Sequence, residues 1–321
     1  MRHKARKYSD IGTTKGIVRM TSYRSANEVK ASFDDIYQAP TPHAYFATMN
    51  DLEYAIGQEA RPFFHSTVAL MRRRLGKEIP IRMLDLGCSY GVGSALVKYG
   101  FSFVEIADFF QNAADQNYHQ CVKDTREWLA ESEPVKRITC IGADASAEAI
   151  KFASEAGLID GGIAHDLEAD QELDEAERLL IRKCNLLIST GAIGYVGEKS
   201  LSAILKHLGK GSALAHGPYT VVTILRMFQP EPIAATFNKF GYRFEAVPGV
   251  HLRQRRFHDE KEQQESIRLI KARGLGAQEL ESDGYLYADL FIGSPEADFA
   301  ELLNDMQETW QRLEASVPVT A

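Results

Sequence analysis

The residues best suited to chemistry are a glycine-rich turn that follows an apolar segment and is preceded by an acid. Residues 83–93 read MLDLGCSYGVG, and the apolar residues 95–97 follow. Glycine has no Cβ and tolerates positive φ, so such a turn lets a ligand approach the backbone closely. The pattern predicts a strand, a turn and a helix. In open α/β sheets, ligands bind beyond the carboxyl ends of the strands, where this turn would lie.

Two phosphate-binding motifs do not fit this turn. A dinucleotide-binding turn has the pattern G-x-G-x-x-G, whereas the glycines here are Gly87, Gly91 and Gly93. A Walker A loop has Lys and then Ser or Thr after its glycines, and no such pair follows here. The acid Asp85 before the first glycine instead indicates a ligand that carries no phosphate at this point.

Two further short apolar segments also end in an acid. Residues 141–146 read IGADAS and residues 163–168 read IAHDLE, which place Asp144 and Asp166 after predicted strands. A carboxylate has two acceptor oxygens, so each of these acids could accept hydrogen bonds from a bound ligand. Ser146 is a suitable N-cap for a helix that begins at residue 147. A fourth segment, LLISTGA at 186–192, ends in a loop.

Taken in order, these segments resemble the motifs of class I S-adenosylmethionine (SAM) dependent methyltransferases over about residues 81–293. The resemblance implies a Rossmann-like, doubly wound α/β fold with a mostly parallel seven-stranded sheet, and SAM as the cofactor. In it, Asp144 would bind the ribose hydroxyls, Asp166 the adenine amine, and the Leu167 N–H the adenine ring. The cofactor-binding residues that it implies are Asp85, Gly87, Cys88, Ser89, Gly91, Asp144, Ala145, Asp166, Leu167, Ser189 and Thr190.

Two of these assignments carry conditions. Ser89 stands where the motif usually has its central glycine, which a serine tolerates if its φ stays negative, and its hydroxyl could contact the cofactor. The ribose acid usually follows the glycine turn by about 20 residues, which fits Glu105 better than Asp144. Ser102 and Glu105, however, have the spacing of a capping box, which would open a helix. We favour Asp144 and keep Glu105 as the alternative.

The elements that must position these residues alternate between apolar runs and helical segments. Helices separate the first five predicted strands, which indicates parallel βαβ units. We expect a tail and helical cap at 1–80, a SAM-binding domain at 81–293 with a helical insertion at about 101–135, and a C-terminal helix and tail at 294–321. The predicted strands are 81–86, 138–143, 162–164, 185–189, 220–227, 242–247 and 285–292.

The cap, the insertion and the fourth loop supply candidates for the substrate side. Aromatic rings near a sulfonium can provide cation–π attraction. The candidates for the substrate pocket are Tyr37, Tyr45, Phe46, Tyr118 and Tyr195. The catalytic residue is left unassigned; Tyr195 and His119 are the candidates, with His165 and His216 as further possible bases. The segment of Arg253, Arg255 and Arg256 is predicted to be a solvated edge, with binding of a substrate carboxylate as its alternative.

Composition narrows the partners and the compartment. The 321 residues carry 37 Lys and Arg against 44 Asp and Glu, a net charge of -7, which argues against a nucleic-acid partner. The four cysteines form no CxxC pair and no metal cluster, so we expect reduced thiols, a cytoplasmic location and no metal. No apolar run approaches ~18 residues, so no membrane span is predicted. The basic residues 1–7 are expected to be a solvated tail. The residues of the insertion are expected to be extra core helix, with a substrate lid or a homodimer contact as the alternative.

The expected reaction is direct transfer of a methyl group from SAM to a small molecule, such as a specialised metabolite or an amino-acid-like compound. Two alternatives remain open at this point. One is a SAM-consuming enzyme that transfers or cyclises the aminocarboxypropyl group and releases methylthioadenosine. The other is a SAM-binding partner protein without catalytic activity.

Overall fold

The computed structural model describes residues 34–114, 116–169, 172–211, 216–276 and 280–316. The tail predicted at residues 1–7 and the last residues of the C-terminal tail lie outside the described residues.

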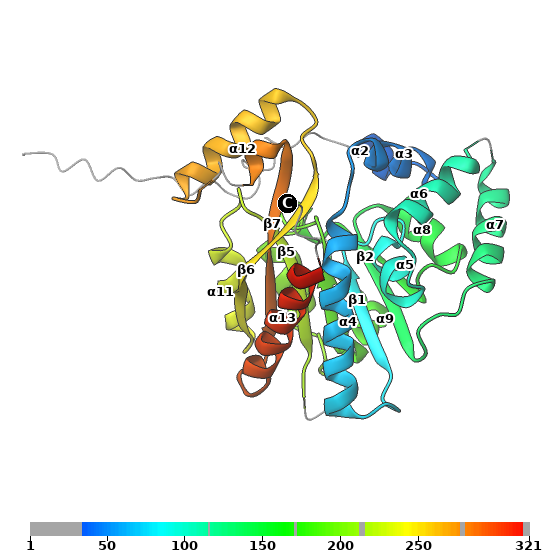
Figure 1. The fold of residues 1–321 in the computed structure, drawn as a ribbon. Helices are drawn as coiled ribbons and strands as arrows, with labels where there is room; N and C mark the ends of the chain where they lie inside the picture. Colours follow the sequence, from blue (N-terminus) through cyan, green and yellow to red (C-terminus); the bar gives the residue numbers. More distant parts are fainter. Residues whose placement is uncertain (1–33, 115, 170–171, 212–215, 277–279, 317–321) are drawn as a thin grey trace, which may run out of the picture.

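A seven-stranded sheet forms the centre of the molecule, in the order β3-β2-β1-β4-β5-β7-β6 (Figure 1). β1 pairs in parallel with both β2 and β4, and only β7, between β5 and β6, is antiparallel to its neighbours among the described strands. The predicted Rossmann-like, mostly parallel fold is thereby confirmed. The strands are β1 (Ile81–Leu86), β2 (Ile138–Asp144), β3 (Gly161–Ala164), β4 (Leu186–Ser189), β5 (Tyr219–Leu225), β6 (Arg243–Arg256) and β7 (Tyr285–Ser294).

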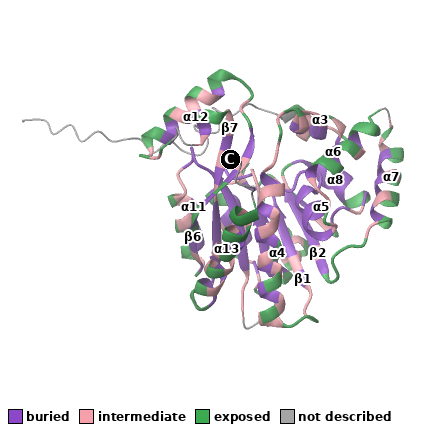
Figure 2. Cartoon of the chain, in the orientation of Figure 1, coloured by how far each residue is buried: buried purple, intermediate pink, exposed green. Residues whose placement is uncertain are grey.

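Burial explains which sequences form the central strands. Every residue of β4 and β5 is buried, with no alternation between polar and apolar positions. Such continuous burial is expected where helices cover both faces of a sheet. Figure 2 shows the same contrast, with buried strands inside and exposed residues on the outer sides of the helices.

The last strand in the sheet order, β6, differs from its predicted length. The sequence pattern predicted a strand that ends at residue 247, but β6 continues to Arg256. Its pairing with β7 shifts register between Ala246 and His251 and again between Arg253 and Arg255. Such bulges insert extra residues into a strand and break its two-residue alternation. This break explains why the sequence pattern did not predict the second half of β6.

Helices surround the sheet, and Figure 1 shows α4 and α13 packed side by side on one face. The cap consists of α2 (Asp34–Tyr37), α3 (His43–Asp51) and α4 (Ile56–Leu75). The insertion consists of α6 (Phe103–Asn112) and α7 (Tyr118–Ala130). The other helices are α5 (Val92–Lys98), α8 (Ala147–Glu155), α9 (Glu175–Lys183), α10 (Glu198–Leu205), α11 (Glu231–Lys239), α12 (Glu260–Ala272) and α13 (Glu296–Ser316), with short 3-10 turns η1 (Leu167–Ala169) and η2 (Glu281–Asp283).

The insertion is helical, as predicted, and it starts at the predicted capping box. The Ser102 side chain accepts a hydrogen bond from the Glu105 N–H, and the Glu105 carboxylate accepts one from the Ser102 N–H. Trp128 of α7 stacks between Phe101 and Phe109, with ring centroids 4.1 and 4.4 Å apart. These contacts tie α7 to the start of the insertion and to α6.

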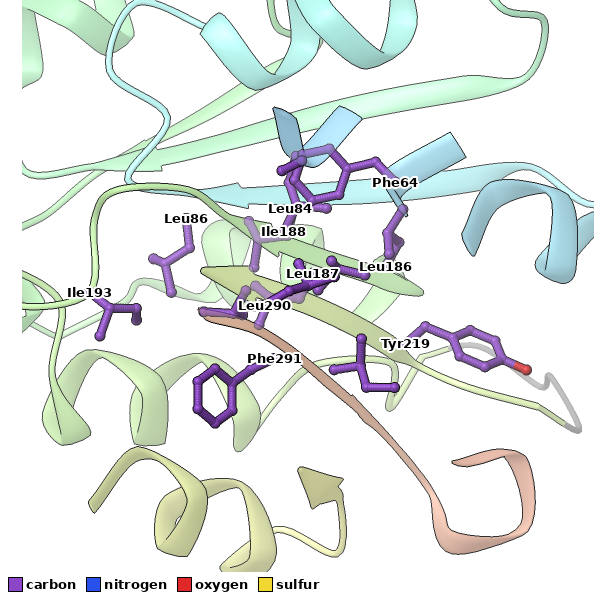
Figure 3. Packing of buried hydrophobic residues seen from close by; sticks show 14 of the residues in the cluster. Phe64, Leu84, Leu86, Leu186, Leu187, Ile188, Ile193, Tyr219, Leu290 and Phe291 are labelled. Carbon is purple, nitrogen blue, oxygen red and sulfur yellow. The ribbon is translucent and has the colours of Figure 1, made fainter. Parts of the chain in front are cut away.

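The apolar interior divides into two clusters. One fills the sheet and the faces of α4 and α13, and Figure 3 shows part of it, including Leu84, Leu187 and Phe291. The other lies among α3, α5, α6, α7 and α8. None of the described helices is both long and apolar enough to cross a membrane.

Candidate functional site

A cavity of about 560 Å³ lies at the carboxyl ends of the parallel strands. Its wall includes the loops after β1, β2, β3 and β4, together with residues from the cap and from β6. β1 is where the strand order changes direction, and ligands of open α/β sheets bind at such a switch point. The volume is also in the range of sites for small molecules. Candidate chemistry should therefore be sought in this wall.

The glycine turn after β1 forms part of the wall through Gly87 and Ser89. Gly87 has a φ of +78°, and a Cβ there would lie 2.2 Å from the Ala192 Cβ. No other residue fits this position, because the loops after β1 and β4 approach each other too closely.

Ser89 does not meet the condition of a negative φ under which a serine would be tolerated at this position. Its φ is +48°, so it adopts the left-handed conformation that the usual glycine of the motif would adopt without strain. Its N–H donates a hydrogen bond of 2.9 Å to Oδ2 of Asp144, a contact that this conformation permits. Its buried hydroxyl oxygen has no hydrogen-bond partner among the described residues.

Asp144 stands at the end of β2 and lines the cavity beside Ala145. Its two oxygens accept hydrogen bonds from different N–H groups, Oδ2 from Ser89 and Oδ1 from Ser146, both at 2.9 Å. Burial raises the pKa of Asp144, and the N–H donors oppose that rise. Glu105, the alternative ribose acid, is instead committed to the capping box of α6 and is not part of the wall.

The segment after β3 supplies the next part of the wall, including His165, Asp166 and Leu167. Oδ1 of Asp166 accepts hydrogen bonds from the N–H groups of Glu168 and Ala169, both at 3.1 Å, which shape the turn η1. His165, one of the further possible bases, lines the cavity with its Nε2 2.9 Å from Glu177.

Four of the predicted cofactor-binding residues lie outside the wall: Asp85, Cys88, Gly91 and Ser189. Their contacts are structural. Ser189 Oγ donates to the Leu86 carbonyl at 2.8 Å, Cys88 packs against β2, and Gly91 precedes α5. Asp85 is buried beneath the turn, and its Oδ2 lies 2.3 Å from where a Cβ on Gly93 would stand. Burial raises the pKa of Asp85 to about 7.

The aromatic candidates divide between the cavity and the core. Tyr37, Tyr45 and Tyr195 line the cavity. Phe46 does not, because its ring stacks on Phe110 at 4.9 Å within the cluster around the insertion. Tyr118 does not either, because its hydroxyl donates to Glu155 at 3.0 Å. The positions of Phe46 and Tyr118 therefore contradict their assignment to the pocket.

The candidate bases also divide between the cavity wall and other parts of the molecule. Tyr195 lies in the wall and is 43% exposed. His119 is exposed on α7 and outside the wall. His216 lies 2.7 Å from Asp298 at the amino end of β5, away from the wall. Of the two catalytic candidates, only Tyr195 is therefore near the cavity.

Two wall residues lie on β6: Gln254, which the sequence did not single out, and Arg255, which was predicted to lie on a solvated edge or to bind a substrate carboxylate. Both are buried, at 3% and 2% exposure, so the prediction of a solvated edge is wrong for Arg255. Its guanidinium donates two hydrogen bonds, of 2.6 and 2.9 Å, to Glu262 of α12. The register shift between Arg253 and Arg255 turns consecutive residues inward. In the sequence, only the acidic residues at the start of α12 indicated a partner for Arg255.

Tyr54 joins the cap to the loop after β4. Its hydroxyl is hydrogen-bonded to the Thr190 side chain and lies 2.9 Å from where a Cβ on Gly191 would stand. In the same way, Gln254 Nε2 lies 3.4 Å from that position. Polar groups from the cap, from β6 and from the fourth loop therefore meet around Gly191. Burial raises the pKa of Tyr54, so its phenol stays protonated.

Comparison with known proteins gives likenesses of structure only. No family model matches the sequence, and no curated protein matches it. One similar solved structure is phosphoethanolamine N-methyltransferase 2 of Haemonchus contortus with S-adenosylhomocysteine (12% identity, TM-score 0.37), in which the alignment covers 86% of this chain and 60% of that one. This chain thus spans less than two thirds of that protein.

Two further similar solved structures are those of shorter proteins. The magnesium protoporphyrin IX methyltransferase of Synechocystis PCC 6803, with bound SAM, is 11% identical with a TM-score of 0.35, and the alignment covers 75% of this chain and 80% of that one. The plantazolicin methyltransferase BamL is 12% identical with a TM-score of 0.40, at 85% and 96% coverage. What each of these proteins binds or methylates is a property of that protein.

Proposed function

We propose that this chain is a SAM-dependent methyltransferase that acts on a small molecule. The observation that carries the proposal is the meeting of three chain segments in one cavity wall: the glycine turn with Ser89, the acid Asp144, and the Asp166–Leu167 segment. They occur in the chain order of the SAM-binding motifs that the sequence resembles. Each also offers the polar groups that the corresponding part of SAM requires.

Different residues of the chain would bind different parts of SAM. Asp144 accepts the ribose hydroxyls, because a carboxylate with both oxygens in place suits a cis-diol. Asp166 accepts the adenine amine, and the backbone at Gly87 allows close approach of the methionine part. When bound, SAM supplies a methyl group on a sulfonium, which is a strong leaving group. The protein then needs chiefly to align the acceptor with that methyl group.

Two features of the structure fit this group. The buried Ser89 hydroxyl, without a partner among the described residues, could take one from the cofactor. Tyr37 and Tyr45 of the cap border the cavity, and rings of this kind can attract a sulfonium. Cap residues form part of the cavity wall. The net charge of -7 favours a small acceptor over a nucleic acid. The four cysteines are free, which agrees with a cytoplasmic location.

Calorimetry and product analysis test this proposal together. We expect the purified chain to bind S-adenosylhomocysteine, and to convert SAM into S-adenosylhomocysteine when a panel of small acceptors is supplied. Mass spectrometry of the sulfur product decides the reaction, since release of methylthioadenosine would contradict methyl transfer. Binding without any sulfur product across the panel would instead indicate a SAM-binding partner protein.

A further inference from the structure

We propose that Gln254 determines which acceptor binds, by pairing with an N–H group that stands beside a carbonyl oxygen, as in an amide or a lactam. This inference deepens the proposed function and rests on it. It is carried by a buried side-chain carboxamide in the cavity wall whose oxygen has no hydrogen-bond partner among the described residues.

Three residues of the cavity wall have a buried polar atom that lacks a partner in the described part of the chain. These atoms are Oγ of Ser89, Nδ1 of His165 and Oε1 of Gln254. Buried polar atoms are seldom left unpaired in a folded protein, so each exception needs an explanation, such as a role in a functional site.

Two of these residues stand where the proposed cofactor would lie. Ser89 is bonded to Asp144, and His165 directly precedes Asp166. Gln254 comes instead from β6, at the edge of the sheet opposite β3. A cofactor bound along the loops after β1, β2 and β3 leaves the part of the cavity beside β6 for the acceptor.

The backbone of β6 directs the Gln254 side chain into the cavity wall. Arg253 and Arg255 pair with consecutive residues of β7, so Gln254 between them is the extra residue of a bulge. Bulges are common beside active sites, where they re-aim a side chain. The Gln254 carbonyl also accepts a 2.7 Å hydrogen bond from the Ala55 N–H of the cap, which holds this backbone in place.

The carboxamide of Gln254 lies beside the loop that follows β4. Its Nε2 is 3.4 Å from where a Cβ on Gly191 would stand, and the Tyr54 hydroxyl is 2.9 Å from the same point. Because residue 191 is a glycine, no side chain covers the carboxamide from that direction. The last torsion of a glutamine side chain is soft and roughly two-fold, so the carboxamide can turn its oxygen towards a donor in the cavity.

The chemistry of a carboxamide indicates which ligand group completes it. An acceptor oxygen and an NH₂ donor stand side by side on Gln254. The oxygen is the atom without a partner, so the ligand must bring a donor. An N–H beside a carbonyl oxygen pairs with both atoms of the carboxamide at once, whereas a single hydroxyl pairs well with only one of them. Such a site rejects an analogue that lacks the donor, because the buried oxygen then stays unpaired.

The test uses three small probes with rings of the same size: valerolactam, N-methylvalerolactam and cyclohexanol. The first has an N–H beside its carbonyl, the second has a methyl group in place of that hydrogen, and the third has only a hydroxyl. The full chain is first saturated with S-adenosylhomocysteine, and failure of that step would overturn the proposed function and this inference with it.

Each probe is then titrated into the saturated chain by calorimetry at pH 7. We expect valerolactam to bind at least about threefold more tightly than either other probe, as one additional hydrogen bond would give. A smaller preference over either probe, or no binding of valerolactam, would overturn the role of Gln254 and leave the proposed function standing.

A pair of variants assigns the preference to Gln254. Gln254→Met removes the carboxamide and nearly keeps the size of the side chain. Gln58→Met is the matched control, because Gln58 lies outside the wall and its Oε1 already accepts a 3.3 Å hydrogen bond from the Phe103 N–H. The preference for valerolactam over N-methylvalerolactam should disappear in Gln254→Met and persist in Gln58→Met, with the affinity for S-adenosylhomocysteine unchanged in both. A preference that survives in Gln254→Met, or that both variants lose equally, contradicts the proposal.

Urea denaturation of the ligand-free chain separates a role in binding from a role in the fold. Gln254→Met removes a buried oxygen that has no partner, so the urea concentration at the midpoint of unfolding should be at least that of the wild type. A lower midpoint in Gln254→Met would show that the carboxamide stabilises the fold, and would contradict its assignment to the acceptor.

Discussion

The backbone N–H of Ser89 donates a 2.9 Å hydrogen bond to Oδ2 of Asp144, which lies 55 residues later in the chain. This bond fastens the turn after β1 to the acid after β2, although the whole helical insertion separates them in sequence. β1 and β2 are neighbours in the sheet, so their carboxyl ends meet whatever the length of the connection between them. The insertion therefore does not separate the two loops, and its helices contribute to the second apolar cluster.

Replacement of Asp144 by Ala tests the proposed cofactor site directly. The variant removes the acceptor proposed for the ribose and leaves the Ser89 and Ser146 N–H groups without this partner. Hydrogen bonds to a charged group contribute about 1.5–3 kcal/mol, so binding of S-adenosylhomocysteine should weaken by roughly tenfold to 150-fold in calorimetry.

Glu105→Ala is the matched control, because this acid is the alternative for the same role. The variant removes the capping box of α6, so the free energy of unfolding should fall by about 1 kcal/mol. The affinity for S-adenosylhomocysteine should stay unchanged. An affinity loss confined to Glu105→Ala would reverse the assignment of the ribose acid.

Ser89→Gly tests the strain at the glycine turn. Ser89 has a positive φ, which costs an L-residue about 1 kcal/mol or more and costs glycine almost nothing. In urea denaturation the glycine variant should be about 1 kcal/mol more stable than Ser89→Ala, which keeps the strain and also lacks the hydroxyl. If the hydroxyl contacts the cofactor, both variants should bind S-adenosylhomocysteine more weakly. Equal stability of the two variants would show that this backbone conformation is not strained.

The sequence predicted those features that depend on local pattern. The seven strands follow from apolar runs, and the start of the insertion follows from the Ser102 and Glu105 spacing. Asp144 could be placed because an acid at the end of a strand must face the ligand edge of a parallel sheet.

Other features depend on non-local geometry and could not be predicted. Arg255 turns inward because of a bulge that is set by the pairing of β6 with β7. Phe46 leaves the pocket because the insertion offers Phe110 as a stacking partner. Ser89 adopts a positive φ in a turn whose N–H bonds to an acid on another strand. In each case the deciding contact comes from a distant part of the chain.

The buried acid Asp85 should make stability depend on pH. Burial raises its pKa to about 7 in the folded chain, whereas an unfolded Asp titrates near about 3.9. Above pH 4 the unfolded chain loses this proton first, so the free energy of unfolding falls as the pH rises towards 7, by at most ~1.4 kcal/mol per unit. Asp85→Asn removes this titration.

Urea denaturation of the wild type and of Asp85→Asn at pH 5 and pH 8 measures the effect. The stability of the wild type relative to the variant should fall by up to ~3 kcal/mol between the two values. Effects of the other titrating groups cancel in this difference. An unchanged difference would mean that Asp85 is already ionised at pH 5.

The buried pair of Arg255 and Glu262 should dominate the stability of the β6 and α12 region. Both side chains are almost fully buried, so Glu262→Ala leaves a charge without its partner and should cost about 3–5 kcal/mol. Replacing both with apolar residues, as Arg255→Met with Glu262→Leu, removes both charges and should restore most of that loss. Lys123→Ala, which breaks an exposed pair with Glu127, serves as the control and should cost less than about 0.5 kcal/mol. Urea denaturation of the wild type and the three variants measures these free energies of unfolding. If the double variant is as unstable as Glu262→Ala, the loss of stability comes from packing and not from the charge left without its partner.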